Sequence, residues 1–384
     1  MRSIFPPLFI LSFAVYPLVA GAQPDSSQEG INAVSPNDVY FVAPGAEQIL
    51  EAQIQSTQGN TVVSWLNATR STLTSETSIF QREFSLAGWS VPVQIQSSSR
   101  KISTLTSEIT NQGDAQFAWV ERQESGLNQL QFTDSTGVIQ PVIQTPFAID
   151  SVSIREIDST TTLAWSEGGA GVFTSFLAYS VNNDWRVIPL SEEANAYDIL
   201  PQVLQTTPPS VLWYSLQHSG FKIQQLQQNQ GDWLKTNNQG LGFLPTERLP
   251  VLFDVPASAL PGAFWIEPSP LGDQMSVFDP RNVESTQVKS LPKRTGVQHL
   301  DPEVAVHWQE DDSEIAFAWV EETAKDRYVI VRVRDQEYLV SSVPAPRQPR
   351  LAWFSDSELH LVVLSEQSLG GDGQLYFARV FLVD

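Results

Sequence analysis

The sequence predicts an all-β fold, a seven-bladed β-propeller whose blades are four-stranded antiparallel sheets. A short apolar run that ends in tryptophan recurs six times, and a seventh copy carries valine in place of the tryptophan. Successive copies lie 44 to 54 residues apart, which is the length of one blade, and helical periodicity is almost absent. The repeated positions are Trp65, Trp119, Trp165, Trp213, Trp265, Trp319 and Val363.

Each repeat divides into four expected strands, and the sixth repeat shows the division most clearly. Its inner strand is expected over 303–309, its second over 315–320, its third over 328–334 and its outer strand over 337–343. The second strands are apolar without alternation, which is typical of strands buried on both faces between neighbouring blades. An X-Pro step is expected just before several inner strands, where proline fixes an extended backbone, at Pro201, Pro250, Pro302 and Pro349.

The last repeat contains only three expected strands, because the sequence ends directly after the third. Residues 38–43, with the sequence DVYFVA, are an expected strand that has no partner in the first repeat. We expect this N-terminal strand to complete the last blade, because docking there closes the ring and covers an exposed sheet edge. Six blades with an appended hairpin is the alternative, since the seventh copy lacks its tryptophan.

The first residues predict export. Arg2 precedes an apolar run over 4–19, and Ala20-Gly21-Ala22 gives the small-x-small pattern of a signal-peptide cleavage site. Three prolines interrupt the run, which is also short for a membrane span. We therefore predict a cleaved signal peptide over 1–22, a periplasmic or secreted location and no later membrane span.

The rest of the chain is predicted to be a disordered linker over 23–36 and a single propeller domain over 37–384. The formal net charge of -21 disfavours nucleic acid as a partner. The sequence has no cysteine, which excludes disulfides, thiolate metal sites and a cysteine nucleophile, so packing must stabilise the fold. We expect a monomer.

Three turns between expected third and outer strands keep the tryptophan and one or two turn residues of the Asp-box, Ser-x-Asp-x-Gly-x-x-Trp. They are Ser85-Leu86-Ala87-Gly88-Trp89, Asn182-Asn183-Asp184-Trp185 and Gly231-Asp232-Trp233. In these turns the chain resembles the sialidase-like β-propellers, whose repeats carry Asp-boxes. None of the three is a complete Asp-box, so the resemblance supports the architecture and says little about activity.

The same resemblance implies what a sialidase would need: an arginine cluster for the substrate carboxylate, a tyrosine nucleophile with a glutamate base, and an acid. Arg248, Arg347 and Arg350 precede expected inner strands. No Arg-Ile-Pro-like signature accompanies them, and the early repeats offer no matching arginine. We therefore assign no catalytic residue, and a sialidase-like glycoside hydrolase is the alternative function.

Other catalytic and metal motifs are missing from the sequence. The four histidines are dispersed without the spacing of metal ligands, and there is no Gly-x-Ser-x-Gly elbow. We therefore predict no metal site and no cofactor, except that the turn at 370–373 leaves calcium open through Asp372. The plainer interpretation of that glycine-rich turn is a hairpin tip.

A glutamate occurs two residues after the repeat tryptophan in four copies, as Glu121, Glu167, Glu267 and Glu321. Strand alternation places each carboxylate on the same side as its tryptophan, at the end of the second strand, so the fold gathers all four on one face of the ring. As a functional site, they would form an acidic rim that binds a cation, a basic partner or a polyhydroxylated ligand. As structural groups, they would accept hydrogen bonds from the neighbouring blade's backbone or face water. The predicted function is a non-catalytic scaffold that binds a protein, peptide or glycan partner.

Overall fold

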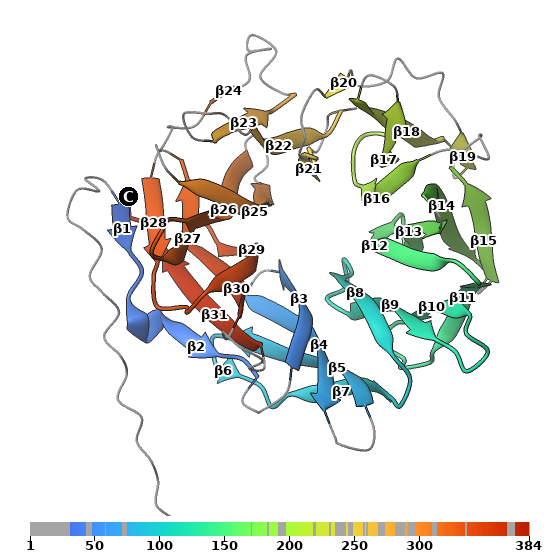
Figure 1. The fold of residues 1–384 in the computed structure, drawn as a ribbon, viewed down its shortest axis with the longest axis horizontal. Coiled ribbons are helices and arrows are strands. Elements are labelled where there is room, and N and C mark those ends of the chain that lie inside the picture. Colours follow the sequence, from blue (N-terminus) through green and yellow to red (C-terminus); the bar gives the residue numbers. More distant parts are fainter. Residues whose placement is uncertain are drawn as a thin grey trace, which may run out of the picture.

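The computed structural model describes residues 31–383 with internal gaps. The gaps are 44–47, 58, 71–74, 170, 183, 191–196, 218–219, 230–231, 235–242, 245–248, 256–257, 259, 268–272, 281–288, 291–296, 309–312, 335 and 367–372. The described strands form seven sheets arranged around a central axis (Figure 1). The protein is therefore a seven-bladed β-propeller, as the sequence predicts, and the six-blade alternative is wrong.

The blades follow one another along the chain, and each sheet runs from an inner strand near the axis to an outer strand at the rim (Figure 1). The inner strands, in chain order, are β3 (Gln48–Thr57), β8 (Ile102–Ile109), β12 (Ala148–Ile157), β16 (Asp198–Leu204), β21 (Val251–Phe253), β25 (Gln298–Trp308) and β29 (Pro346–Ser355). The second strands are β4 (Asn60–Arg70), β9 (Ala115–Arg122), β13 (Thr160–Gly169), β17 (Ser210–Gln217), β22 (Gly262–Glu267), β26 (Ser313–Glu322) and β30 (Glu358–Ser365).

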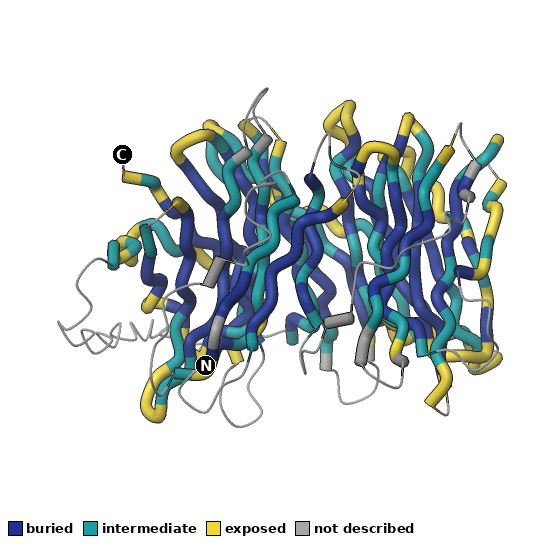
Figure 2. Tube along the Cα trace, turned by 90° about the horizontal axis from the view of Figure 1, so that it is seen from above, coloured by how far each residue is buried: buried dark blue, intermediate teal, exposed yellow. Residues whose placement is uncertain are grey.

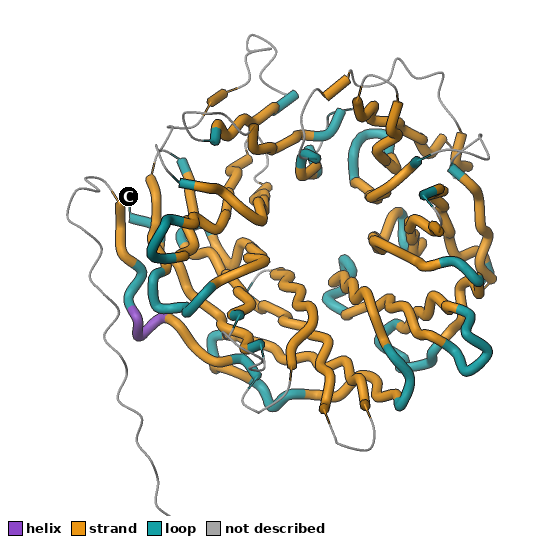
Figure 3. Tube along the Cα trace, in the orientation of Figure 1, coloured by secondary structure: helices purple, strands orange, loops and turns teal. Residues whose placement is uncertain are grey.

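The third strands are β5 (Ser75–Ser85), β10 (Asn128–Thr133), β14 (Val172–Val181), β18 (Gly220–Asn229), β23 (Gln274–Phe278), β27 (Arg327–Val333) and β31 (Gln374–Phe381). The outer strands are β6 (Gly88–Trp89) with β7 (Val93–Ser98), β11 (Gln140–Thr145), β15 (Asp184–Pro189), β19 (Asp232–Leu234) with β20 (Phe243–Leu244), β24 (Lys289–Ser290), β28 (Gln336–Val340) and β2 (Val39–Phe41). Figure 3 shows that strands make up most of the described chain.

The N-terminal segment closes the ring. β2 pairs antiparallel with β31 and so supplies the outer strand of the seventh blade, which confirms the sequence prediction. The segment also adds β1 (Ile31–Ala33), which pairs parallel with β28 at the edge of the sixth blade. The predicted linker over 23–36 is therefore wrong for 31–33, which form a strand, while 23–30 and the signal peptide lie outside the described residues.

A separate hydrophobic core fills each of the seven spaces between neighbouring blades. Buried residues run along the middle of the strands, and exposed residues gather at the two ends of the ring (Figure 2). Each repeat tryptophan packs against the preceding blade: Trp165 of the third blade, for example, lies in one core with Leu130 of the second. The tryptophan therefore recurs in the sequence because each copy fills one interface between blades.

The seventh blade has an alternative to the missing tryptophan. Val363 is fully buried at the expected position, and Trp353 of the inner strand β29 occupies the same core. The indole of Trp353 donates a hydrogen bond across the interface to the carbonyl oxygen of Ala305, at 3.2 Å. A tryptophan on the inner strand thus supplies much of the volume that the second strand lacks.

The inner strands share a bulge near the repeat tryptophan. In six blades the pairing with the second strand shifts register there. At five of these bulges one residue adopts the left-handed backbone conformation, namely Thr104, Ser151, Leu200, Asp301 or Gln348. The bulge also changes the interpretation of the X-Pro steps. Pro250 directly precedes β21 as predicted, but Pro201, Pro302 and Pro349 lie inside their strands at the bulge, where no ladder donor is required.

Truncation tests the N-terminal closure. Compared with a chain that begins at Ile31, a chain that begins at Val34 lacks β1 and is expected to melt a few degrees lower. A chain that begins at Ala43 also lacks β2 and the fully buried Val42, whose amide donates to Leu375 at 3.0 Å. That chain exposes the edge of β31 and is expected to melt lowest and to aggregate. Equal melting temperatures for the three chains would contradict closure by the N-terminal strands.

Candidate functional site

The repeated glutamates lie at the ends of second strands, on the face of the ring that we call the upper face: the face where second strands end and inner strands begin. Three of them accept a hydrogen bond from the indole nitrogen of their own repeat tryptophan. The distances from Nε1 to Oε1 are 3.0 Å for Trp165 and Glu167, 2.8 Å for Trp265 and Glu267, and 3.2 Å for Trp319 and Glu321. The two-residue spacing along a strand brings the side chains to the same face and so permits this bond.

Side chains at the end of the preceding blade's outer strand, β11 or β7, also reach two of the four carboxylates. Thr145 donates to Oε2 of Glu167 at 2.8 Å, and Ser98 donates to Oε1 of Glu121 at 2.6 Å. Arg100 lies 3.8 Å from the same Glu121 oxygen. These contacts join a second strand to the end of the preceding blade's outer strand.

The sixth-blade carboxylate is the most deeply buried of the four. Glu321 is fully buried, and its Oε1 lies 3.6 Å from Nε2 of His299, which is also buried. On the other side of the imidazole, Asp273 of the preceding blade accepts a hydrogen bond from the backbone nitrogen of His299 at 3.0 Å. Here the glutamate belongs to a packed polar cluster between the fifth and sixth blades.

The structure therefore puts the four predicted residues at equivalent places in four blades and gives each at least one donor within the fold. Glu121, Glu167 and Glu321 are buried, and Glu267 is half-buried. The donors differ from the structural interpretation of the sequence, because they are indole and hydroxyl groups rather than the neighbouring backbone. The acidic rim as a ligand-binding site stays a prediction.

A second group of charges lies on the inner strands and joins blades around the axis. Arg155 of β12 donates to Glu108 of the second blade at 2.9 Å and to Asp254, directly after β21 of the fifth blade, at 3.1 Å. Asp254 in turn accepts from the backbone nitrogen of Gln205, in the fourth blade, at 2.7 Å. One guanidinium thus connects carboxylates of two other blades.

A similar pair lies on the other side of the ring. Arg350 of β29 donates to Glu303 of β25 at 2.8 Å. Burial raises the pKa of Glu303, and Arg350 opposes this effect. Burial likewise raises the pKa of Glu51 in β3, although that carboxylate accepts from the backbone nitrogen of Leu105 at 2.8 Å. Neighbouring Glu303 raises the pKa of Arg350, so the charged guanidinium is favoured.

Of the arginines that the sequence analysis singled out, Arg350 is in this ion pair and Arg347 lies 4.0 Å from Glu366. Arg248 and Asp372 fall outside the described residues. No sequence pattern predicted a role for Arg155, Glu108 or Asp254. Glu108 and Arg155 could have been noticed as charged residues within inner strands. Their pairing could not, because the contacts join residues 47 and 99 positions apart in the sequence.

No group of three or more histidine, aspartate or glutamate side chains in the described part of the chain is arranged to hold a metal ion. No described helix is long and apolar enough to span a membrane.

Comparison with known proteins adds support for the fold alone. No family model matches the sequence, and no curated protein matches it. Among solved structures, the β-propeller domain of the Trilobed protease from Pyrococcus furiosus is similar, with a TM-score of 0.51 and 7% identity over 89% of this chain and 97% of that one. That domain is described as having an open velcro topology. Here, by contrast, β2 pairs with β31.

Two further solved structures have lower scores. A protein of unknown function from Dyadobacter fermentans has a TM-score of 0.48 and 10% identity, over 90% of this chain and all of that one. The NanB sialidase from Streptococcus pneumoniae has a TM-score of 0.45 and 9% identity, over 89% of this chain and 70% of that one. The class that the structure defines is the seven-bladed β-propeller.

Substitution of Glu167 tests the structural role of the repeated glutamates. Glu167→Gln keeps the side-chain shape but weakens the bonds from Trp165 and Thr145, because the acceptor loses its charge. We expect the free energy of unfolding to fall by about 1 kcal/mol in urea titrations. Glu124→Gln, at an 87% exposed side chain on the upper face, is the matched control and should change it by less than about 0.5 kcal/mol. An unchanged or higher stability for Glu167→Gln would contradict a structural role.

The pair of Glu108 and Arg155 predicts a pH dependence. Burial raises the pKa of Glu108 from 4.5 to about 7, with Arg155 opposing the effect and Asp254 adding to it. A raised carboxyl pKa means that the folded state holds the proton more tightly. The contribution of Glu108 to stability is therefore greatest below about pH 4.5 and is lost as the pH rises through 7.

We expect the unfolding free energy of the parent protein, minus that of Glu108→Gln, to fall by up to about 3 kcal/mol between pH 4.5 and 8. Urea titrations at several pH values measure it, with Glu124→Gln as the control that should show no such slope. A difference that stays constant or rises with pH would contradict the raised pKa of Glu108.

Proposed function

We propose that the protein is an exported, non-catalytic propeller scaffold that binds a protein, peptide or glycan partner. The proposal includes the predicted signal peptide over 1–22 and a periplasmic or secreted location. A channel that binds an acidic substrate requires guanidinium groups free to clamp its carboxylate. The observation that carries the proposal is the pairing of Arg155 and Arg350, whose guanidinium groups donate to carboxylates of other blades.

The upper face supports the same conclusion. General acid–base chemistry on a glycoside uses two carboxyl groups that reach one bond. The repeated glutamates each accept from tryptophan, serine or threonine side chains of their own interface, and they lie in four different blades. An arrangement of this kind holds blades together and leaves recognition to the surface between them.

The experiment has a turnover arm and a binding arm. A fluorogenic sialoside should release no fluorophore above the buffer blank between pH 4 and 8, measured beside an active sialidase. A peptide display library and a glycan array, each probed with the purified protein, should yield at least one ligand class with saturable binding. Turnover that Arg350→Met abolishes would overturn the proposal, and so would the absence of saturable binding to both libraries.

A further inference from the structure

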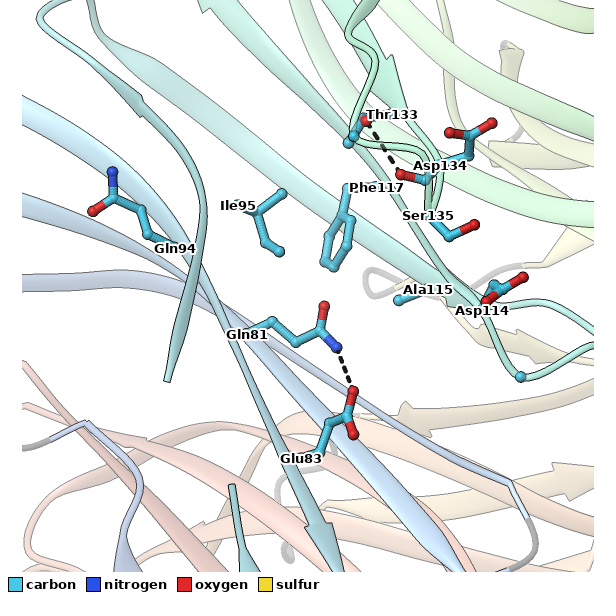
Figure 4. Close-up of a pocket in the computed structure, with 12 residues that line it drawn as sticks. Gln81, Glu83, Gln94, Ile95, Asp114, Ala115, Phe117, Thr133, Asp134 and Ser135 are labelled. Atoms are coloured by element: carbon cyan, nitrogen blue, oxygen red, sulfur yellow. Dashed lines mark hydrogen bonds between the residues drawn. The ribbon is translucent and has the colours of Figure 1, made fainter. Parts of the chain in front are cut away.

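A cavity of about 390 Å³ lies between the first and second blades. On the first blade it is lined by β5 and β7, and on the second by the start of β9 and by the turns that follow β8 and β10 (Figure 4). These turns lie at the lower face of the ring, opposite the repeated glutamates. The cavity is therefore separate from the inner-strand ion pairs of Arg155 and Arg350 and from the upper face.

The cavity combines an apolar wall with acidic groups. Phe117 and Ile95 face its interior, and Gln81 donates to Glu83 along one side, at 3.1 Å (Figure 4). Asp114 and Asp134 line it from the second blade, and Oδ1 of Asp134 accepts a hydrogen bond from the backbone nitrogen of Thr136 in its own turn, at 2.9 Å. The described residues that line the cavity include no lysine, arginine or histidine, so every ionisable group there is acidic.

Exposed apolar side chains lie on the two connections that border the cavity. On the first blade, Leu86, Val91 and Val93 are 91%, 81% and 57% exposed, and Val93 directly precedes the lining residue Gln94. On the second, Val138 and Ile139 are 58% and 40% exposed and directly follow the lining residue Gly137. Five large apolar side chains thus stay exposed on the strands and turns beside the cavity.

The arrangement of the acids favours an organic cation over a metal ion. Three carboxylates line one cavity, yet no described group of three acidic or histidine side chains is close enough to hold a metal. A lysine or arginine side chain matches this spacing better, because its charged end is carried on an apolar stem. The stem would contact Phe117 and Ile95 while the cationic end reaches the carboxylates.

We propose that this groove binds a basic segment of a polypeptide partner. One lysine or arginine side chain of the segment enters the cavity, and the apolar residues on either side of it contact Val93 and Val138. Charge complementarity selects the occupant: a cavity whose ionisable groups are all acidic, on a chain with a net charge of -21, attracts a cationic segment. The inference deepens the proposed scaffold function by naming the surface and the class of partner, and it rests on that function.

The test uses the short peptide acetyl-Leu-Arg-Leu-amide as the probe and acetyl-Leu-Gln-Leu-amide as its neutral counterpart. Titration of the isotope-labelled protein, followed by NMR, should shift the amide signals of Gln81 and Ala115. We expect the arginine peptide to bind at least tenfold more tightly than the glutamine peptide. Because the contact is electrostatic, 0.5 M salt should weaken binding.

Two variants locate the interaction. Asp114→Asn removes one charge from the cavity and should weaken binding of the arginine peptide at least threefold. Glu124→Gln removes one charge from an exposed site on the upper face of the same blade and should leave binding unchanged. Equal binding of the two peptides, equal effects of the two variants, or binding of methyl glycosides in place of the peptide would each overturn the inference. A ligand from the display library that binds elsewhere would overturn it too while leaving the scaffold function intact, whereas sialoside turnover would overturn both.

Discussion

The constraint on which the rest of the structure depends is that inner strands of neighbouring blades do not pair with each other. In six blades the inner strand bulges near the repeat position, and backbone groups that the bulge removes from the ladder need partners. Side chains of adjacent blades provide them. Glu51 accepts from the backbone nitrogen of Leu105, Ser153 from that of Val203 at 3.1 Å, and Asp301 from that of Gln348 at 2.9 Å. Blades are thus joined at the axis by bonds from side chain to backbone.

This constraint determines what the centre of the ring can do. Arg155 and Arg350 both donate to carboxylates of other blades and so hold blades together. At the upper face, Glu167 accepts hydrogen bonds from Trp165 of its own strand and from Thr145 of the preceding blade. The groove between the first two blades, which we propose as a binding surface, lies apart from both sets of contacts.

Much of the architecture could be predicted because it is periodic in the sequence. The repeated tryptophan gave the number of blades, and the unpartnered strand near the N-terminus gave the closure, since β2 fills the missing place beside β31. The partners of Glu108 and Glu321 could not be predicted, because those contacts join residues of different blades or strands and depend on exact side-chain positions. The bulges escaped prediction for a local reason: Pro201, Pro302 and Pro349 mark extended backbone equally well before a strand and within one.

The central claim, that side chains of one blade satisfy the bulged backbone of the next, is tested most directly by amide hydrogen exchange at Leu105. Its N–H donates to Glu51, so the parent protein should protect it from exchange. In Glu51→Ala the amide of Leu105 should lose that protection, while the amide of Trp119 on the paired strand β9 keeps its own. Unchanged protection of Leu105 in Glu51→Ala would contradict the claim.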